Sequence, residues 1–123
     1  MKVIIAGGLK YVFTEEDKIW LDGHKEIISE VVCGEAKGAD TEGRKWAESH
    51  NIPVKSFPAE WKKFGRNKAG FIRNQQMADY ADGLIAFEGG NGTADMIKRA
   101  NKCCRFVIYA EKPVDFDVLF DII

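Results

Sequence analysis

Three glycine-rich segments of the sequence contain residue types that bind phosphate. Each follows a short apolar run, and they read GG at 7–8, GEAKGAD at 34–40 and GGNGT at 89–93. The glycines concerned are Gly7, Gly8, Gly34, Gly38, Gly89, Gly90 and Gly92. Glycine lets the backbone approach a ligand closely, and a helix N-terminus offers free N–H groups, to which Thr93 could add a hydroxyl donor. The sequence predicts an anion site if the three segments share one edge of a sheet; otherwise each is only a tight turn.

Arg73 is the clearest candidate for a charged side chain that binds a ligand. With helical spacing it shares a face with Ala69, Gln76, Met77 and Tyr80, which we interpret as the packed face of a helix. A guanidinium on a packed face needs a charged partner. That partner is either a carboxylate of the same chain or a ligand phosphate or carboxylate, which the guanidinium can bind through two parallel hydrogen bonds.

Other polar residues of these segments each have two interpretations. Asp40 could cap a helix or accept hydrogen bonds from ligand hydroxyls. Asn74 could donate to the ligand, and Asn91 could do the same or shape the turn. Tyr11, just after the first glycine pair, could stack on a base or pack in the core.

Length and composition predict one domain that covers residues 1–123. Hydrophobic residues make up 46% of the chain and the net charge is -1, which favours a packed core and no general attraction to nucleic acid or membranes. No apolar run reaches the ~18 residues that span a bilayer. The start MKVIIAGG is interpreted as a strand rather than a signal peptide, so a cytoplasmic location is expected. Three cysteines without paired spacing predict neither a disulfide framework nor a metal site, and no cofactor is expected.

Predicted strands and helices alternate along the chain. The strands are Val3–Ala6, Val31–Cys33, Val54–Phe57, Leu84–Phe87 and Phe106–Tyr109, and the helices span 14–28, 39–50, 68–80 and a segment from Thr93. Nearly continuous apolar strands are typical of a parallel sheet that is covered on both faces. The predicted fold class is therefore α/β, a Rossmann-like doubly wound domain with a mainly parallel sheet of about five strands and flanking helices. The last residues, 111–123, fit a half-buried strand and a helix equally well.

A basic segment at 61–73, WKKFGRNKAGFIR, offers an alternative function. It contains no acidic residue, and Trp61, Phe64 and Phe71 could stack on bases. Single-stranded nucleic acid is therefore the weaker alternative as a partner, and its affinity would fall steeply with salt. A solvated basic face is the simpler interpretation.

The chain resembles the SLOG superfamily of Rossmann-like domains, and within it the YspA-like branch. The resemblance covers nearly the whole chain and is carried by IIAGG at 4–8, VVCGEAKGAD at 31–40, WAESHNIPVKSFPAEW at 46–61, GRNKAGFIRNQQM at 65–77 and ADGLIAFEGGNGT at 81–93. It implies a parallel sheet, a nucleotide or nucleotide-like ligand and, often, a homodimer.

The resemblance extends in part to the LOG-type phosphoribohydrolases, which cleave the N-glycosidic bond of nucleoside monophosphates. In those enzymes an Arg stands four residues before a Met, as Arg73 does before Met77, and a PGGxGTxxE motif supplies a catalytic Glu. GGNGT matches the glycine part of this motif, but Met96 stands at the position of the Glu and cannot activate water. Asp95 is one residue away, about 100° around a helix. Lys10 stands near a position where the branch often has an Arg, and it could replace that anion contact.

Two functions follow from these observations. The first is the binding of a nucleotide-derived ligand, for sensing or sequestration, through the glycine-rich turns. The alternative is an N-glycosidic hydrolase or transferase that acts on nucleotides. Its candidate carboxylates are Glu35, Glu88, Asp95 and Asp40, of which Glu35 and Glu88 lie in predicted turns and could act as an acid–base pair.

Overall fold

A computed structural model of the chain describes residues 1–34, 38–66 and 68–110. The tail at 111–123 and the candidate Glu35 therefore lie outside the described residues. Within the described ranges the sheet contains five parallel strands, β1 (Lys2–Ala6), β2 (Glu30–Cys33), β3 (Val54–Ser56), β4 (Gly83–Ala86) and β5 (Phe106–Tyr109), in the order β3-β2-β1-β4-β5. The order runs outward from β1 in both directions, which confirms the predicted Rossmann-like α/β fold.

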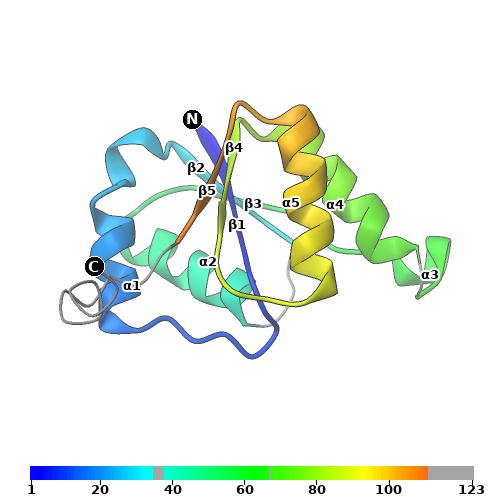
Figure 1. Cartoon of the computed structure of the whole chain (residues 1–123), viewed down its shortest axis with the longest axis horizontal. Coiled ribbons are helices and arrows are strands. Elements are labelled where there is room, and N and C mark those ends of the chain that lie inside the picture. The colour runs from blue at the N-terminus through cyan, green and yellow to red at the C-terminus, as the bar shows by residue number, and fades with distance from the viewer. Residues whose placement is uncertain (35–37, 67, 111–123) are drawn as a thin grey trace, which may run out of the picture.

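Helices cover both faces of the sheet (Figure 1). One face packs against α1 (Glu15–Asp22) and α2 (Ala39–Ser49), and the other packs against α4 (Ala69–Tyr80) and α5 (Asn91–Cys103). A short helix, α3 (Trp61–Phe64), precedes α4, and a 3-10 turn (Lys25–Ile27) follows α1.

Strand β1 shows why the apolar runs are continuous. Its side chains alternate between the two layers: Val3 and Ile5 belong to the cluster under α1 and α2, and Ile4 belongs to the cluster under α4 and α5. All three are fully buried. Because both faces of the strand are covered, the four buried positions Val3–Ala6 are all apolar, and the sequence loses the alternation of a half-exposed strand.

Helix α1 begins as predicted but ends early. Thr14 and Asp17 form a capping box, in which the Thr14 hydroxyl accepts from the Asp17 N–H at 3.1 Å and the Asp17 carboxylate accepts from the Thr14 N–H at 3.0 Å. The helix was expected to continue to Ile28 but stops at Asp22. Gly23 closes it through hydrogen bonds to preceding carbonyls, and the chain then enters the 3-10 turn.

Two expectations about the later helices were wrong. The buried side chains of α4 are Ala69, Asn74, Met77 and Ala78, whereas Gln76 is exposed and Arg73 only partly buried. Because α5 packs beside α4 as well as over the sheet, the buried stripe of α4 is rotated toward α5. Helix α5 begins at Asn91, so Asn91 lies in its first helical turn rather than shaping the preceding turn.

Candidate functional site

A cavity of about 610 Å³ opens at the carboxyl ends of β1 and β4. These strands are neighbours, but β1 leads to a helix on one face of the sheet and β4 to a helix on the other. The connections diverge at this point and leave a crevice, which is where ligands bind in open parallel sheets. The size is within the range of small-molecule sites.

Most of the sequence-predicted site residues lie around this cavity. Those that line it are Gly7, Gly8, Lys10, Asp40, Arg73, Asn74, Glu88, Gly90, Asn91, Gly92 and Thr93. Gly34, Gly38, Gly89 and Asp95 are not among the lining residues. The lining also includes Ala6, Leu9, Tyr11, Met77 and Met96, of which Ala6 and Leu9 had no sequence signal apart from their proximity to the first glycine pair.

The glycines of the three turns differ in what surrounds them. A methyl group on Gly38 would lie 2.1 Å from the Gly8 carbonyl oxygen, and one on Gly89 would lie 2.2 Å from Thr93 Oγ1. Likewise, a methyl group on Gly34 would lie 2.5 Å from Arg73 Nη1. Gly38 and Gly89 also meet backbone atoms and are needed for packing within the protein, whereas Gly34 meets only the end of the flexible Arg73 side chain. By contrast, a methyl group on Gly90 or Gly92 would have no atom within 4 Å, so their lack of a side chain leaves the backbone open to the cavity.

The open glycines lie at the N-terminus of α5. Gly90 is the N-cap residue and has no side chain with which to cap the helix, and no acidic residue lies in the first turn of α5. The first N–H groups of a helix have no partners within the helix and carry a partial positive charge. The N-terminus of α5 therefore offers unfilled hydrogen-bond donors on the cavity side.

Gly8 joins the three glycine turns to one another. Its N–H donates to the Glu88 carbonyl at 2.8 Å, and its own carbonyl accepts from the N–H groups of Tyr11 at 3.1 Å and Ala39 at 3.2 Å. The N-terminus of α2, which begins at Ala39, is thus partly satisfied within the protein. Of the helix ends near the cavity, that of α5 is the more available for an anion.

Arg73 reaches across from α4 toward the turn that follows β2. Its Nη1 donates to the Gly34 carbonyl and its Nε donates to Asn74 Oδ1 at 3.1 Å. In the described part of the chain no carboxylate lies within 4.0 Å of the guanidinium, so the internal salt bridge, one of the two alternatives for Arg73, is not found there. The other N–H donors of the guanidinium have no hydrogen-bond partner among the described residues, which leaves them for a ligand in the cavity.

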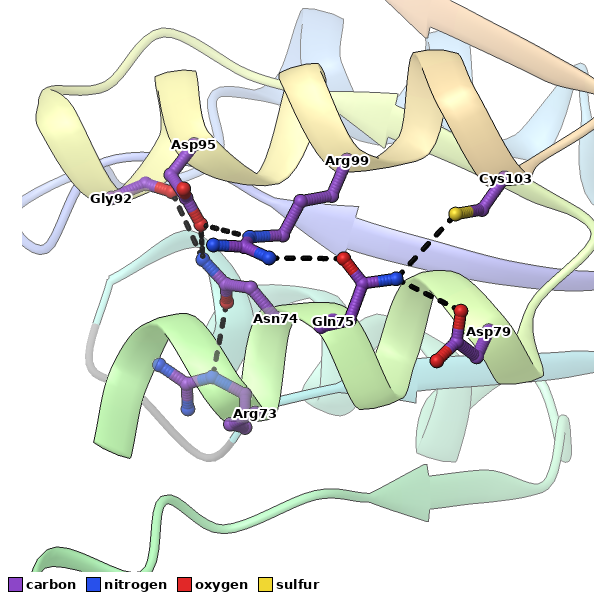
Figure 2. A network of polar contacts seen from close by, with 8 residues as sticks. All are labelled: Arg73, Asn74, Gln75, Asp79, Gly92, Asp95, Arg99 and Cys103. Atoms are coloured by element: carbon purple, nitrogen blue, oxygen red, sulfur yellow. Dashed lines mark hydrogen bonds and ion pairs between the residues drawn. The ribbon is translucent and has the colours of Figure 1, made fainter. Parts of the chain in front are cut away.

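Asn74 connects Arg73 to the first turn of α5 (Figure 2). The side chain is 6% exposed, and its amide nitrogen donates to the Gly92 carbonyl at 3.3 Å and to Asp95 Oδ2 at 3.0 Å. Its amide oxygen accepts from Arg73 Nε. With these bonds to neighbouring residues, Asn74 holds Arg73 and the N-terminus of α5 in a fixed relation.

The three described candidate carboxylates are in different environments. Asp95 forms an ion pair with Arg99 at 2.8 Å and lies outside the cavity lining. Glu88 is exposed and Asp40 is buried, and both line the cavity. Met96, 1% exposed, also lines it at the position where LOG-type enzymes have their Glu. No cluster of His, Cys, Asp and Glu that could hold a metal ion occurs among residues 1–34, 38–66 and 68–110.

Tyr11 borders the cavity, and its side chain is fixed by contacts with Phe87 and Asp17. Its ring packs against Phe87 at 5.3 Å, and its hydroxyl donates to Asp17 Oδ2 at 2.8 Å. Burial, this hydrogen bond and the charges of Asp17 and Glu88 raise the pKa of Tyr11 to about 12 from its ordinary value of 10.0. The raised pKa reflects a phenol that is stabilised in its neutral form.

The raised pKa of Tyr11 predicts a stability change at high pH. The unfolded chain releases this proton near pH 10 and the folded chain only near pH 12. The stabilisation from Tyr11 is therefore complete below pH 10 and lost as the pH rises toward 12. We expect the difference in free energy of unfolding between the wild type and Tyr11→Phe to shrink over this range in urea titrations. A constant difference from pH 9 to pH 12 would contradict this account.

The fold and the cavity define a class of protein: a Rossmann-like α/β domain with a glycine-lined crevice at the point where its strand order reverses. The chain belongs to the YspA, cpYpsA-related SLOG family, whose family model matches residues 1–64. This confirms the resemblance seen in the sequence. No curated protein and no solved structure matches the chain significantly. The matched residues include the first two glycine turns, whereas Arg73 and the GGNGT turn lie beyond them.

In the described residues, no helix is long and apolar enough to cross a membrane.

Proposed function

We propose that the protein binds a nucleotide or nucleotide-derived ligand by its phosphate in the cavity at the ends of β1 and β4. Membership of the SLOG family supports a nucleotide-related role. The observation that carries the proposal is the open N-terminus of α5 at Gly90 and Gly92, beside the guanidinium of Arg73 in the same cavity. Helix N–H groups and an arginine are the donors that phosphate requires.

The remaining polar residues around the cavity suit the other parts of a nucleotide. Lys10 is exposed at the cavity edge and would add a positive charge near the phosphate. Asp40 and Glu88 would accept hydrogen bonds from ribose hydroxyls, because an ionised carboxylate has acceptors and no donor. Tyr11 and Leu9 provide an aromatic ring and an apolar side chain at the rim, against which a base could pack.

Binding without cleavage fits the cavity better than hydrolysis does. The thioether of Met96 can neither stabilise a developing positive charge nor take a proton from water. Asp95, the nearest carboxylate in the sequence, is bound to Arg99 and Asn74 rather than exposed to the cavity. A sensing or sequestering role therefore requires fewer changes to the observed contacts than catalysis.

A thermal-shift panel tests the proposed function. The panel contains nucleoside 5′-monophosphates, the matching nucleosides, inorganic phosphate, ADP-ribose and cyclic dinucleotides. A ligand at 100 times its Kd should stabilise the fold by about 2.7 kcal/mol, a rise in Tm of several degrees. We expect a phosphate-bearing ligand to raise the Tm and its nucleoside not to do so. An equal shift with the nucleoside, or no shift on the panel, would argue against a phosphate site. Release of free base during the incubation would instead favour the hydrolase.

The variant Gly92→Ala separates an effect on ligand affinity from an effect on the stability of helix α5. Gly92 is the second residue of α5 and faces open space, so alanine fits without a clash. Because alanine is a better helix former, the free protein should become more stable by at most about 1 kcal/mol. The new methyl group would occupy space next to the phosphate, so we expect ligand affinity to fall at least about tenfold.

Gly70→Ala is the matched control for this prediction. Gly70 is the second residue of α4, and a methyl group there would make only ordinary van der Waals contacts, the nearest with Arg73 Nη2 at 3.8 Å, which does not require the guanidinium to move. The control should gain similar stability and keep its affinity, both measured by urea unfolding and calorimetric titration. If the two variants bind equally well, the N-terminus of α5 does not hold the phosphate.

A further inference from the structure

Trp61 is the most exposed of the three tryptophans. Trp46 is 5% exposed and donates to Asp22 Oδ1 at 2.9 Å, and the ring of Trp20 packs against the ring of His24 at 4.2 Å. Trp61 is 53% exposed, and in the described part of the chain its indole has no hydrogen bond and no aromatic neighbour. Packing explains the first two tryptophans, whereas the indole of Trp61 is left for a ligand.

The indole of Trp61 lies beside the guanidinium of Arg73. A methyl group on Gly70 would lie 3.8 Å from Arg73 Nη2 and 3.9 Å from Trp61 Cη2, so both groups flank the same point at the start of α4. Arg73 lines the cavity at the ends of β1 and β4, and Trp61 does not. The indole therefore extends the site past the guanidinium, outside the cavity.

The segment that contains Trp61 and Arg73 is strongly basic. Residues 61–73 include five of the 18 Lys and Arg residues of the chain and none of its 19 Asp and Glu residues. Helix α3, which begins the segment, lies at the end of α4 away from the sheet, and none of its residues is buried (Figure 1). Lys62 and Lys68 are exposed and have no acidic residue within 4.0 Å among the described residues. This surface attracts a ligand that carries negative charge beyond the cavity.

We propose that the ligand is a single-stranded oligonucleotide of two or more residues, an inference that rests on the proposed phosphate site. Its terminal nucleoside occupies the cavity, the phosphate that follows lies between Arg73 and the N-terminus of α5, and the next base stacks on Trp61. Proteins bind single strands by this combination of a positively charged surface and exposed aromatic rings. The basic segment and the cavity then bind two parts of one ligand.

Dinucleoside monophosphates test the proposal because they contain a second base but no more phosphate than a mononucleotide. Calorimetric titration should show that they bind at least about fivefold more tightly than the nucleoside 3′- or 5′-monophosphate of the same base, the gain expected from one stacked base. All four bases are tested. A mixed-sequence hexanucleotide should bind at least as tightly, and its affinity should fall more steeply with salt than that of a mononucleotide.

Trp61→Ala should remove the advantage of the second base. The indole is exposed and outside the cavity, so this variant should fold and keep its affinity for mononucleotides, while dinucleoside monophosphates bind no more tightly than mononucleotides. Phe71→Ala is the matched control. Phe71 is 46% exposed and belongs to the same basic segment, but it borders a separate hollow beside Arg99 of α5. This variant should bind both kinds of ligand as the wild type does.

Tryptophan fluorescence gives a second readout that does not depend on affinity. A base that stacks on an indole quenches its emission, so saturating dinucleoside monophosphate should quench the wild type and saturating mononucleotide should not. Trp61→Phe keeps an aromatic ring for stacking, so it should retain part of the gain in affinity and lose the quenching.

The possible outcomes distinguish this proposal from the phosphate site. If mononucleotides and dinucleoside monophosphates bind the wild type equally, or if Trp61→Ala keeps the advantage of the second base, the oligonucleotide proposal is overturned and the phosphate site stands. A loss of the advantage in Phe71→Ala would overturn the assignment to Trp61 as well. If neither kind of ligand binds at all, the phosphate site itself fails.

Discussion

Replacing Arg73 by alanine should weaken binding of the nucleotide that stabilises the protein by about 30-fold. Hydrogen bonds to charged groups are worth about 1.5–3 kcal/mol, and about 2 kcal/mol corresponds to this factor. The guanidinium is half-buried and has no carboxylate partner in the described part of the chain, so a ligand phosphate would be its main counter-charge. Isothermal titration calorimetry measures the change directly.

Two further variants define the role of Arg73. Arg73→Lys keeps the charge but loses the planar fork and the bond to Asn74, so an intermediate affinity is expected. Arg66→Ala removes an exposed positive charge from the same basic segment and should leave affinity unchanged. Since Arg73→Ala also leaves the Gly34 carbonyl without this donor, the unfolding of each variant is measured without ligand. Normal affinity in a folded Arg73→Ala protein would exclude the arginine from the site.

The fold could be predicted from the sequence because its signals are local. Continuous apolar runs such as that around Ile4 and Ile5 identify buried parallel strands, and the Thr14–Asp17 capping box identifies a helix start. That the turns share one edge of the sheet follows from parallel strands alone. The order of the strands does not, so the position of β1 beside β4 had to come from the structure.

The detailed roles of the site residues could not be predicted because they depend on distant contacts. Arg73 binds the Gly34 carbonyl across 39 positions of the sequence, and Asn74 binds the Gly92 carbonyl across 18. Nothing in the local pattern distinguishes the packing glycine Gly38 from the open glycine Gly92. The difference appears only when the neighbours of each missing side chain are known.

Gly38→Ala should cause the largest loss of stability among the variants considered. Gly38 has a φ of +76°, which side chains disfavour, and the new methyl group would lie 2.1 Å from the Gly8 carbonyl oxygen and 2.5 Å from the Leu9 carbonyl carbon. Those neighbours are backbone atoms and cannot rotate away. We expect a loss of about 3 kcal/mol or more, a fall in Tm of about 10 °C, because backbone strain and steric overlap act together.

The variant Gly65→Ala separates the cost of backbone strain from the cost of steric overlap between the new methyl group and its neighbours. Gly65 has a similar φ of +81°, but a methyl group there would have no atom within 4 Å. Its alanine variant should lose only about 1–2 kcal/mol, the cost of the unfavourable backbone conformation. The difference between the two variants in urea unfolding therefore measures how tightly the turn after β2 packs on the turn after β1. Equal losses would mean that the Gly8 turn moves away at little cost. In that case the wall of the cavity formed by Gly8 and Leu9 would be adjustable rather than fixed.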